Sequence, residues 1–123
     1  MKGAWFYMKS KDKIALEKMV AYAKELESYI TGMDYDAFSA DSKTINACAL
    51  LIGQLGELTT VISSEAQSMY TEIPWRNIKG MRNRIIHDYD NVDFIVLWKT
   101  VSESIPQLLN TIQNALDNTP QEE

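Results

Sequence analysis

The fold and the chemistry of this chain both depend on residues 74–89, which read Pro-Trp-Arg-Asn-Ile-Lys-Gly-Met-Arg-Asn-Arg-Ile-Ile-His-Asp-Tyr. Pro74 suits the first turn of a helix, because its missing N–H would have no intrahelical partner there. The apolar residues recur at helical spacing, at Ile78, Met81 and Ile85. This spacing predicts a helix with one buried face, ending near His87 or Asp88, where turn-forming residues follow.

The same stretch holds the densest positive charge in the sequence. Its basic residues are Arg76, Lys79, Arg82 and Arg84, and no acidic residue lies between Pro74 and His87. The rest of the chain has eight basic and seventeen acidic residues, a formal charge of −9 against +4 here. His87 is the only histidine, and histidine is the residue type best suited to proton transfer near neutral pH. The sequence therefore predicts a functional site where an anion-attracting patch meets this histidine.

Helical periodicity extends to both sides of this stretch. One helix is predicted from Ser10, as its N-cap, to about Thr31, with Gly32 as a left-handed stop. Another is predicted to begin near Asp41 or Ser42. The apolar stripes are Leu16, Met19, Ala23, Leu26 and Ile30 in the first helix, and Ile45, Cys48, Leu51, Ile52, Leu55, Leu58, Thr59 and Ile62 in the second.

A last helix is predicted from about Val92 towards Asp117. Pro106 should kink it, because proline cannot donate a hydrogen bond to the carbonyl of Ser102. Its apolar stripe is Ile95, Trp98, Val101, Ile105, Leu108, Ile112 and Leu116. Four amphipathic helices with short connections predict an all-α fold, an antiparallel four-helix bundle with a kinked C-terminal helix.

The segments between and outside the helices are predicted to be irregular. Residues 33–40 form a connector that contains at most a short turn of helix and that Phe38 anchors to the core, and residues 65–73 form a loop. The predicted division of the chain is an N-terminal extension at 1–8, one helical domain at 9–117 and a frayed polar tail at 118–123. Translation is expected to start at Met1 or Met8.

Composition excludes several classes of protein. With 123 residues, 46% of them apolar and 24% charged, the chain suits one soluble domain with its own core. The single Cys48 excludes an internal disulfide and fits a reducing, cytoplasmic setting. No apolar run is long enough to cross a membrane, and the first residues are too few for a signal peptide. The net charge of −5 argues against broad nucleic-acid binding, although it allows a local basic cleft.

Two glycines one turn apart, Gly53 and Gly56, lie within the predicted second helix. Each lowers helix propensity by about 1 kcal/mol relative to alanine. A helix that keeps both needs another backbone to come close. The neighbouring backbone is either another helix of the same chain, the simpler alternative, or a second subunit.

The residues of the motif suit cleavage of RNA without a metal. His87 can act as general acid and base, Arg82 can clamp a phosphate, and Asn83, one turn before His87, can orient the imidazole or a substrate oxygen. Arg76, Lys79 and Arg84 would attract RNA. Arg82 and His87 lie about 140° apart on an ideal helix, so they converge only if the helix ends near His87 or the arginine wraps round. One histidine cannot easily make both proton transfers, but a twofold dimer with both motifs in one cleft could.

A purely structural role is the alternative. Basic residues and a histidine near a helix C-terminus interact favourably with the helix dipole. On residue types alone, this structural role is the commoner one for a single surface histidine. The sequence offers no metal site, because Glu57, Glu65 and Glu72 do not form a ligand set with His87.

The motif Arg82-Asn83-x-x-x-His87-x-Tyr89 resembles the HEPN superfamily, and within it the HepT toxins with their R-x4-H-x-Y signature. The resemblance runs from about Met8 to Ile112. It includes the Ile73-Pro74-Trp75 entry to the helix and the segment from Gly53 to Glu57. Glu57, beside Gly56, is predicted to pair with a motif arginine across the bundle.

The resemblance implies a dimeric helical bundle that cleaves RNA without a metal or other cofactor. It also implies a toxin whose partner is a nucleotidyltransferase antitoxin of the MNT type, which transfers AMP to Tyr89. Negative charge and bulk there would repel RNA. Tyr89 could equally be a half-buried residue that tethers the turn. The alternative function is a non-catalytic dimeric scaffold that binds a nucleotidyltransferase.

Overall fold

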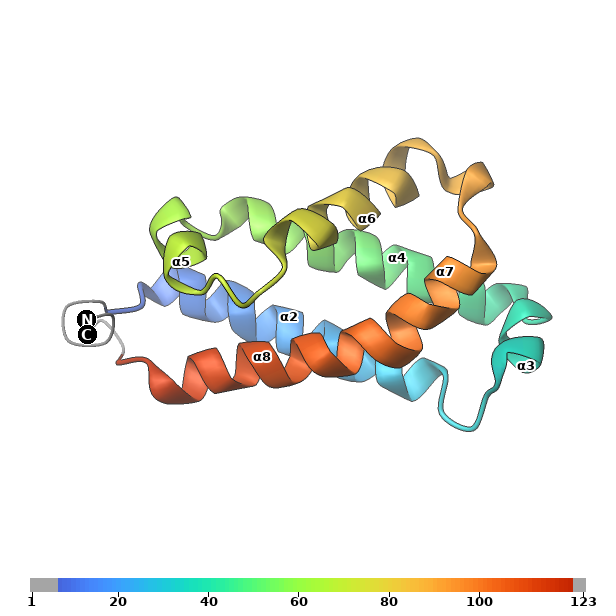
Figure 1. The fold of residues 1–123 in the computed structure, drawn as a ribbon, viewed down its shortest axis with the longest axis horizontal. Helices are drawn as coiled ribbons and strands as arrows, with labels where there is room; N and C mark the ends of the chain where they lie inside the picture. The colour runs from blue at the N-terminus through green and yellow to red at the C-terminus, as the bar shows by residue number, and fades with distance from the viewer. Residues whose placement is uncertain (1–6, 121–123) are drawn as a thin grey trace.

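The computed structural model describes residues 7–120, and these residues fold into helices with no β-strand (Figure 1). The α-helices are α2 Ser10–Tyr29, α3 Tyr35–Ser39, α4 Ser42–Leu58, α5 Ser64–Met69, α6 Trp75–His87, α7 Phe94–Lys99 and α8 Ile105–Asn118. Short 3-10 turns, η1 and η2, cover Thr59–Val61 and Tyr89–Asn91, and a π-helical turn, η3, covers Thr100–Ser104. The predicted all-α fold is confirmed.

The long helices form a bundle around one core. α2 packs against both α4 and α8, α6 packs against α4, and α7, η3 and α8 follow one another as one long rod beside α2 (Figure 1). This rod is the predicted C-terminal helix. The core side chains that are almost fully inaccessible are Met8, Leu16, Met19, Leu26, Phe38, Cys48, Ile73, Leu97, Val101 and Ile112.

Several helix ends follow the predicted signals, and one does not. The Asp41 carboxylate accepts a hydrogen bond from the Thr44 N–H and so caps α4. Gly32 has a positive φ of 79°, as predicted for the stop after α2. The N-cap of α2 is Lys9, with no side-chain hydrogen bond, and Ser10 is the first helical residue. The prediction of Ser10 as the cap was therefore wrong by one position.

The segment predicted as a loop at residues 65–73 contains the short helix α5. Ser63 caps α5, its Oγ accepting from the Ala66 N–H at 3.1 Å. The carboxylate of Asp12, on α2 and 1% exposed, in turn accepts from the Ser63 N–H at 2.8 Å and from its hydroxyl at 2.7 Å. A buried carboxylate from a distant helix therefore fixes the start of α5, and the sequence around Ser63 alone does not predict this contact.

The C-terminal rod also departs from the prediction. The Asp93 carboxylate accepts a hydrogen bond from the Ile95 N–H and caps α7, which begins at Phe94. In this helix Leu97 is buried. Ile95, predicted to face the core, is 43% exposed. The irregularity expected at Pro106 takes the form of the π-helical turn η3, which ends two residues before the proline.

Both ends of the described chain are part of the packed structure. Met8 is buried, and its N–H donates to the carbonyl of Pro120 at 3.0 Å. The hydroxyl of Tyr70 donates to Thr119 Oγ1. Met8 and Thr119 therefore each bind another part of the described chain, and the domain limits at 9 and 117 stay a prediction. The rest of the predicted extension (1–6) and tail (121–123) lies outside the described residues. Across the described part of the chain, no helix has the length and apolar character needed to span a bilayer.

Candidate functional site

The predicted motif lies on α6 and the turn that follows it. α6 begins at Trp75, directly after Pro74, and ends at His87, as predicted. The Asp88 N–H donates to the carbonyl of Arg84 at 2.9 Å, and Tyr89 then begins the turn η2. His87 is therefore the last helical residue, and Tyr89 follows where the chain changes direction.

α6 presents one face to the bundle and a basic face to solvent. Ile78 is buried, and Met81 and Ile85 are partly buried against the core. The side chains of Arg76, Lys79, Arg84 and His87 are all exposed. Spacings of seven and four residues place Arg76, Asn83 and His87 in one row on this outer face. The four predicted cations and the histidine thus share a helix that carries no acidic residue.

Arg82 lies at the edge of that face and reaches across to α4. Its Nε donates to Glu57 Oε1, and its Nη2 forms an ion pair with the same oxygen. Its Nη1 donates to Asn83 Oδ1 at 2.7 Å. The pairing of Glu57 with a motif arginine was only a conjecture from sequence, and the structure shows it. Asn83 contacts Arg82, and no hydrogen bond joins it to His87 among residues 7–120.

Gly56 allows this close approach of α6 to α4. A Cβ atom at Gly56 would lie 2.7 Å from Arg82 Cγ and still closer to its Cβ. A Cβ at Gly53 would lie 3.5 Å from Ile85 Cγ2, an ordinary contact. The backbone close to this pair of glycines is therefore that of α6 in the same chain, and Gly56 is the glycine that requires it.

Tyr89 is tied to the other end of α4. Its hydroxyl donates to Asn46 Oδ1, while the whole residue is 37% exposed. The tethering contact considered for Tyr89 is therefore observed. Asn46 was not singled out from the sequence. Asn46, Gly53 and Glu57 recur at spacings of seven and four, which marks one row of α4 facing α6.

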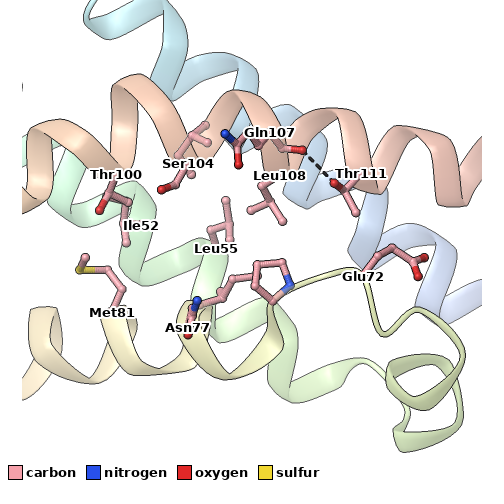
Figure 2. A pocket seen from close by; sticks show the side chains of 13 residues that line it. Ile52, Leu55, Glu72, Asn77, Met81, Thr100, Ser104, Gln107, Leu108 and Thr111 are labelled. Atoms are coloured by element: carbon pink, nitrogen blue, oxygen red, sulfur yellow. Dashed lines mark hydrogen bonds between the residues drawn. The ribbon is translucent and has the colours of Figure 1, made fainter.

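Two hollows flank α6. One, of about 640 Å³, is lined by the predicted RNA-binding residues Arg76 and Lys79 together with Trp75, Gln67, Thr59 and Thr60. The other, of about 540 Å³, lies between α6 and the rod formed by η3 and α8 (Figure 2). Ile52 and Leu55 of α4 form its floor, and Met81 and Leu108 point into it from opposite sides (Figure 2). Neither Arg82 nor His87 lines it.

The remaining reactive groups do not form a second site. Burial raises the pKa of the Cys48 thiol to about 11, so it stays protonated and belongs to the core. In the part of the chain that the structure describes, no three His, Cys, Asp or Glu side chains are placed to hold a metal ion.

Comparisons with known proteins agree with the motif. A family model described as "Ribonuclease HepT-like" matches residues 19–115. The chain is 36% identical over 101 residues to a protein of Thermococcus cleftensis named "Probable ribonuclease HepT", an alignment that covers 82% of this chain and 92% of that one. It is 26% identical over 101 residues to a candidate RNase of Methanocaldococcus jannaschii, covering 82% and 93% of the two chains. No solved structure matches. The extent of the family match and the identity to the Thermococcus protein show that this chain belongs to the HepT-like ribonuclease family.

Proposed function

We propose that this protein is a cytoplasmic, metal-independent RNA endonuclease, the toxin of a toxin–antitoxin pair. The observation that carries the proposal is the outer face of α6, where cations and the only histidine lie together without an acidic residue, in a chain of the HepT-like ribonuclease family. Such a face attracts the RNA backbone to the one group suited to proton transfer near neutral pH.

RNA supplies its own nucleophile for this chemistry. His87 takes the proton of a ribose 2′-hydroxyl, whose oxygen attacks the neighbouring phosphorus. The bond from phosphorus to the 5′-oxygen of the next nucleotide breaks, and that oxygen receives a proton from an imidazolium. Arg82 stabilises the charge on the crowded phosphate. The products are a 2′,3′-cyclic phosphate and a 5′-hydroxyl, and no metal takes part in any step.

The site is proposed to form between two copies of the chain. Each copy has one histidine, while the reaction needs a base and an acid. Arg82 is directed to Glu57, and among the described residues no hydrogen bond joins it to His87. Large apolar residues close to His87 in the sequence are also exposed, and exposed apolar surface favours an interface. They are Ile86, Tyr89, Phe94, Ile95 and Val96.

The proposed antitoxin is a nucleotidyltransferase of the MNT type, which transfers AMP to the Tyr89 hydroxyl. Tyr89 lies two residues after His87 and is partly exposed. AMP on that oxygen would replace the hydrogen bond to Asn46 with bulk and negative charge. RNA phosphate would then be repelled from the basic face.

An RNA cleavage assay in excess chelator tests the proposal. Unmodified protein, shown by mass spectrometry to carry no adduct on Tyr89, is compared with His87→Ala on several classes of RNA. The expected result is cleavage with cyclic-phosphate ends by the unmodified protein and none by the variant. Equal cleavage by both would refute the role of His87, and no cleavage by either would favour a non-catalytic scaffold.

A further inference from the structure

The contact between Arg82 and Glu57 joins the motif to a helix outside it. The two residues are 25 positions apart, on α6 and α4. Arg82 Nε and Nη2 both contact Glu57 Oε1, so the carboxylate binds the side edge of the guanidinium. A long arginine side chain is thereby restricted in its rotation about the terminal bonds.

The other donors of Arg82 show what this contact leaves available. An arginine has five N–H groups. Two are directed to Glu57, and one on Nη1 is donated to Asn83 Oδ1. Two remain, one on each terminal nitrogen, and no residue from 7 to 120 accepts them. Two N–H groups on the terminal nitrogens bind a phosphate in a bidentate way when both point past the end of the guanidinium.

The pair is too exposed to serve chiefly as a stabilising contact. The side chain of Arg82 is 23% exposed and that of Glu57 is 49% exposed. Water screens such ion pairs, so they add little to the free energy of unfolding. Gly56, the residue before Glu57, meanwhile lets the stem of Arg82 lie directly against α4. Gly56 and Glu57 together therefore fix the aliphatic stem and the guanidinium of Arg82.

We propose that Glu57 is a positioning residue for RNA cleavage, which holds Arg82 so that its two remaining N–H groups meet the phosphate. This inference rests on the proposed ribonuclease function. The carboxylate also opposes RNA binding, because its charge repels phosphate. Removal of the Glu57 charge should therefore slow the chemical step without weakening RNA binding. Loss of a merely structural residue would not change the two in this way.

The experiment compares Glu57→Gln with Glu65→Gln, which removes the same charge from α5. Both are assayed in chelator for kcat and KM, with thermal melting as a check on folding. For Glu57→Gln we expect kcat to fall roughly 10- to 100-fold, as for a misplaced catalytic group, with KM unchanged or lower. Glu65→Gln should match the unmodified protein. A kcat for Glu57→Gln equal to that of Glu65→Gln, or higher, would overturn the inference.

A second readout separates this inference from the proposed function. If the unmodified protein cleaves no RNA, the ribonuclease proposal fails, and the Nε–H resonance of Arg82 in a ¹⁵N–¹H spectrum decides the role of Glu57. A shifted, slowly exchanging resonance that is present in Glu65→Gln and lost in Glu57→Gln would support positioning. The same resonance in all three proteins would refute it.

Discussion

The helix that carries the motif and the helix that carries the core are held in the bundle by different means. α2 buries seven of its 20 residues, whereas α6 buries only Ile78 among its 13. α2 is enclosed by α4 and α8, while α6 packs mainly on α4 and is separated from α8 by a hollow (Figure 2). Burial therefore holds α2 in place, and it contributes much less to the position of α6.

At α6, polar contacts and a close approach to α4 fix the orientation of side chains, while the exposed ion pair adds little to the free energy of unfolding. Glu57 binds Arg82, Asn46 binds Tyr89, and Gly56 accepts the stem of Arg82. A helix with an exposed basic face cannot be buried deeply, because its charges must stay in water. The difference between α2 and α6 separates the residues that stabilise the fold from those proposed to bind RNA.

Substitutions at the motif should show this separation most strongly. Arg82→Ala and His87→Ala are each expected to lower kcat roughly 100-fold or more, because each removes a group that the proposed mechanism places at the transition state. Neither side chain belongs to the core, so thermal melting should stay close to that of the unmodified protein. RNA cleavage assays and calorimetry on the same preparations measure both. A large loss of stability in either variant would contradict this distinction between residues that stabilise the fold and residues of the motif.

Truncation of core side chains should have the opposite effect. Leu16→Ala on α2 removes a side chain that is 0% exposed and should lower the free energy of unfolding by about 3 kcal/mol. Met81→Ala on α6 removes one that is only partly buried, and about 1 kcal/mol is expected. Urea titration measures both. Equal losses would mean that α6 is as firmly packed as α2.

The two glycines of α4 provide a matched pair. Gly56→Ala should push α6 away and lower the free energy of unfolding by about 1–3 kcal/mol, because the new methyl group would meet the stem of Arg82. Gly53→Ala meets only Ile85 at ordinary distance and should be neutral or stabilising by up to about 1 kcal/mol. Urea titration of both variants tests this. Similar changes in the two would show that the close approach at Gly56 is not required.

The smallest effect concerns the cap of α4 in acid. Hydrogen bonds from the Thr44 N–H and hydroxyl lower the pKa of Asp41 from its ordinary value of 3.8. A carboxyl whose pKa is lower in the folded state stabilises the protein above its unfolded pKa, and this contribution is lost as pH falls through the folded pKa. Asp41→Ala should therefore be less stable than the unmodified protein at pH 7, with a gap that narrows below about pH 4. A gap that stays constant from pH 7 to pH 2 would argue against this origin.

Local signals in the sequence were enough to predict α6. Pro74 at its start and the turn residues after His87 gave its limits, and the spacing of Ile78, Met81 and Ile85 gave its buried face. Such signals lie within one or two turns of the residues they affect. The start of α4 at Ser42 and the stop at Gly32 were predictable for the same reason.

Features fixed by distant residues were not predictable. The start of α5 depends on Asp12, 51 positions from Ser63, so residues 65–73 read as a loop. Ile95 fits a helical stripe, but tertiary packing selects Leu97 for the core. At the site, the contact from Tyr89 to Asn46 spans 43 positions. A single sequence indicates which residues share a face, but not which helix that face meets.

The most direct test of the central claim, one RNA-cleaving site built from two copies of the motif, uses a dimer that keeps a single histidine. Unmodified and His87→Ala chains are co-expressed with different affinity tags, and the mixed dimer is purified through both tags. The mixed dimer then has only one of the two histidines that the proposed proton transfers need. Cleavage in chelator as low as that of the His87→Ala homodimer is the predicted result. A mixed dimer that retains much of the activity of the unmodified dimer would contradict the claim.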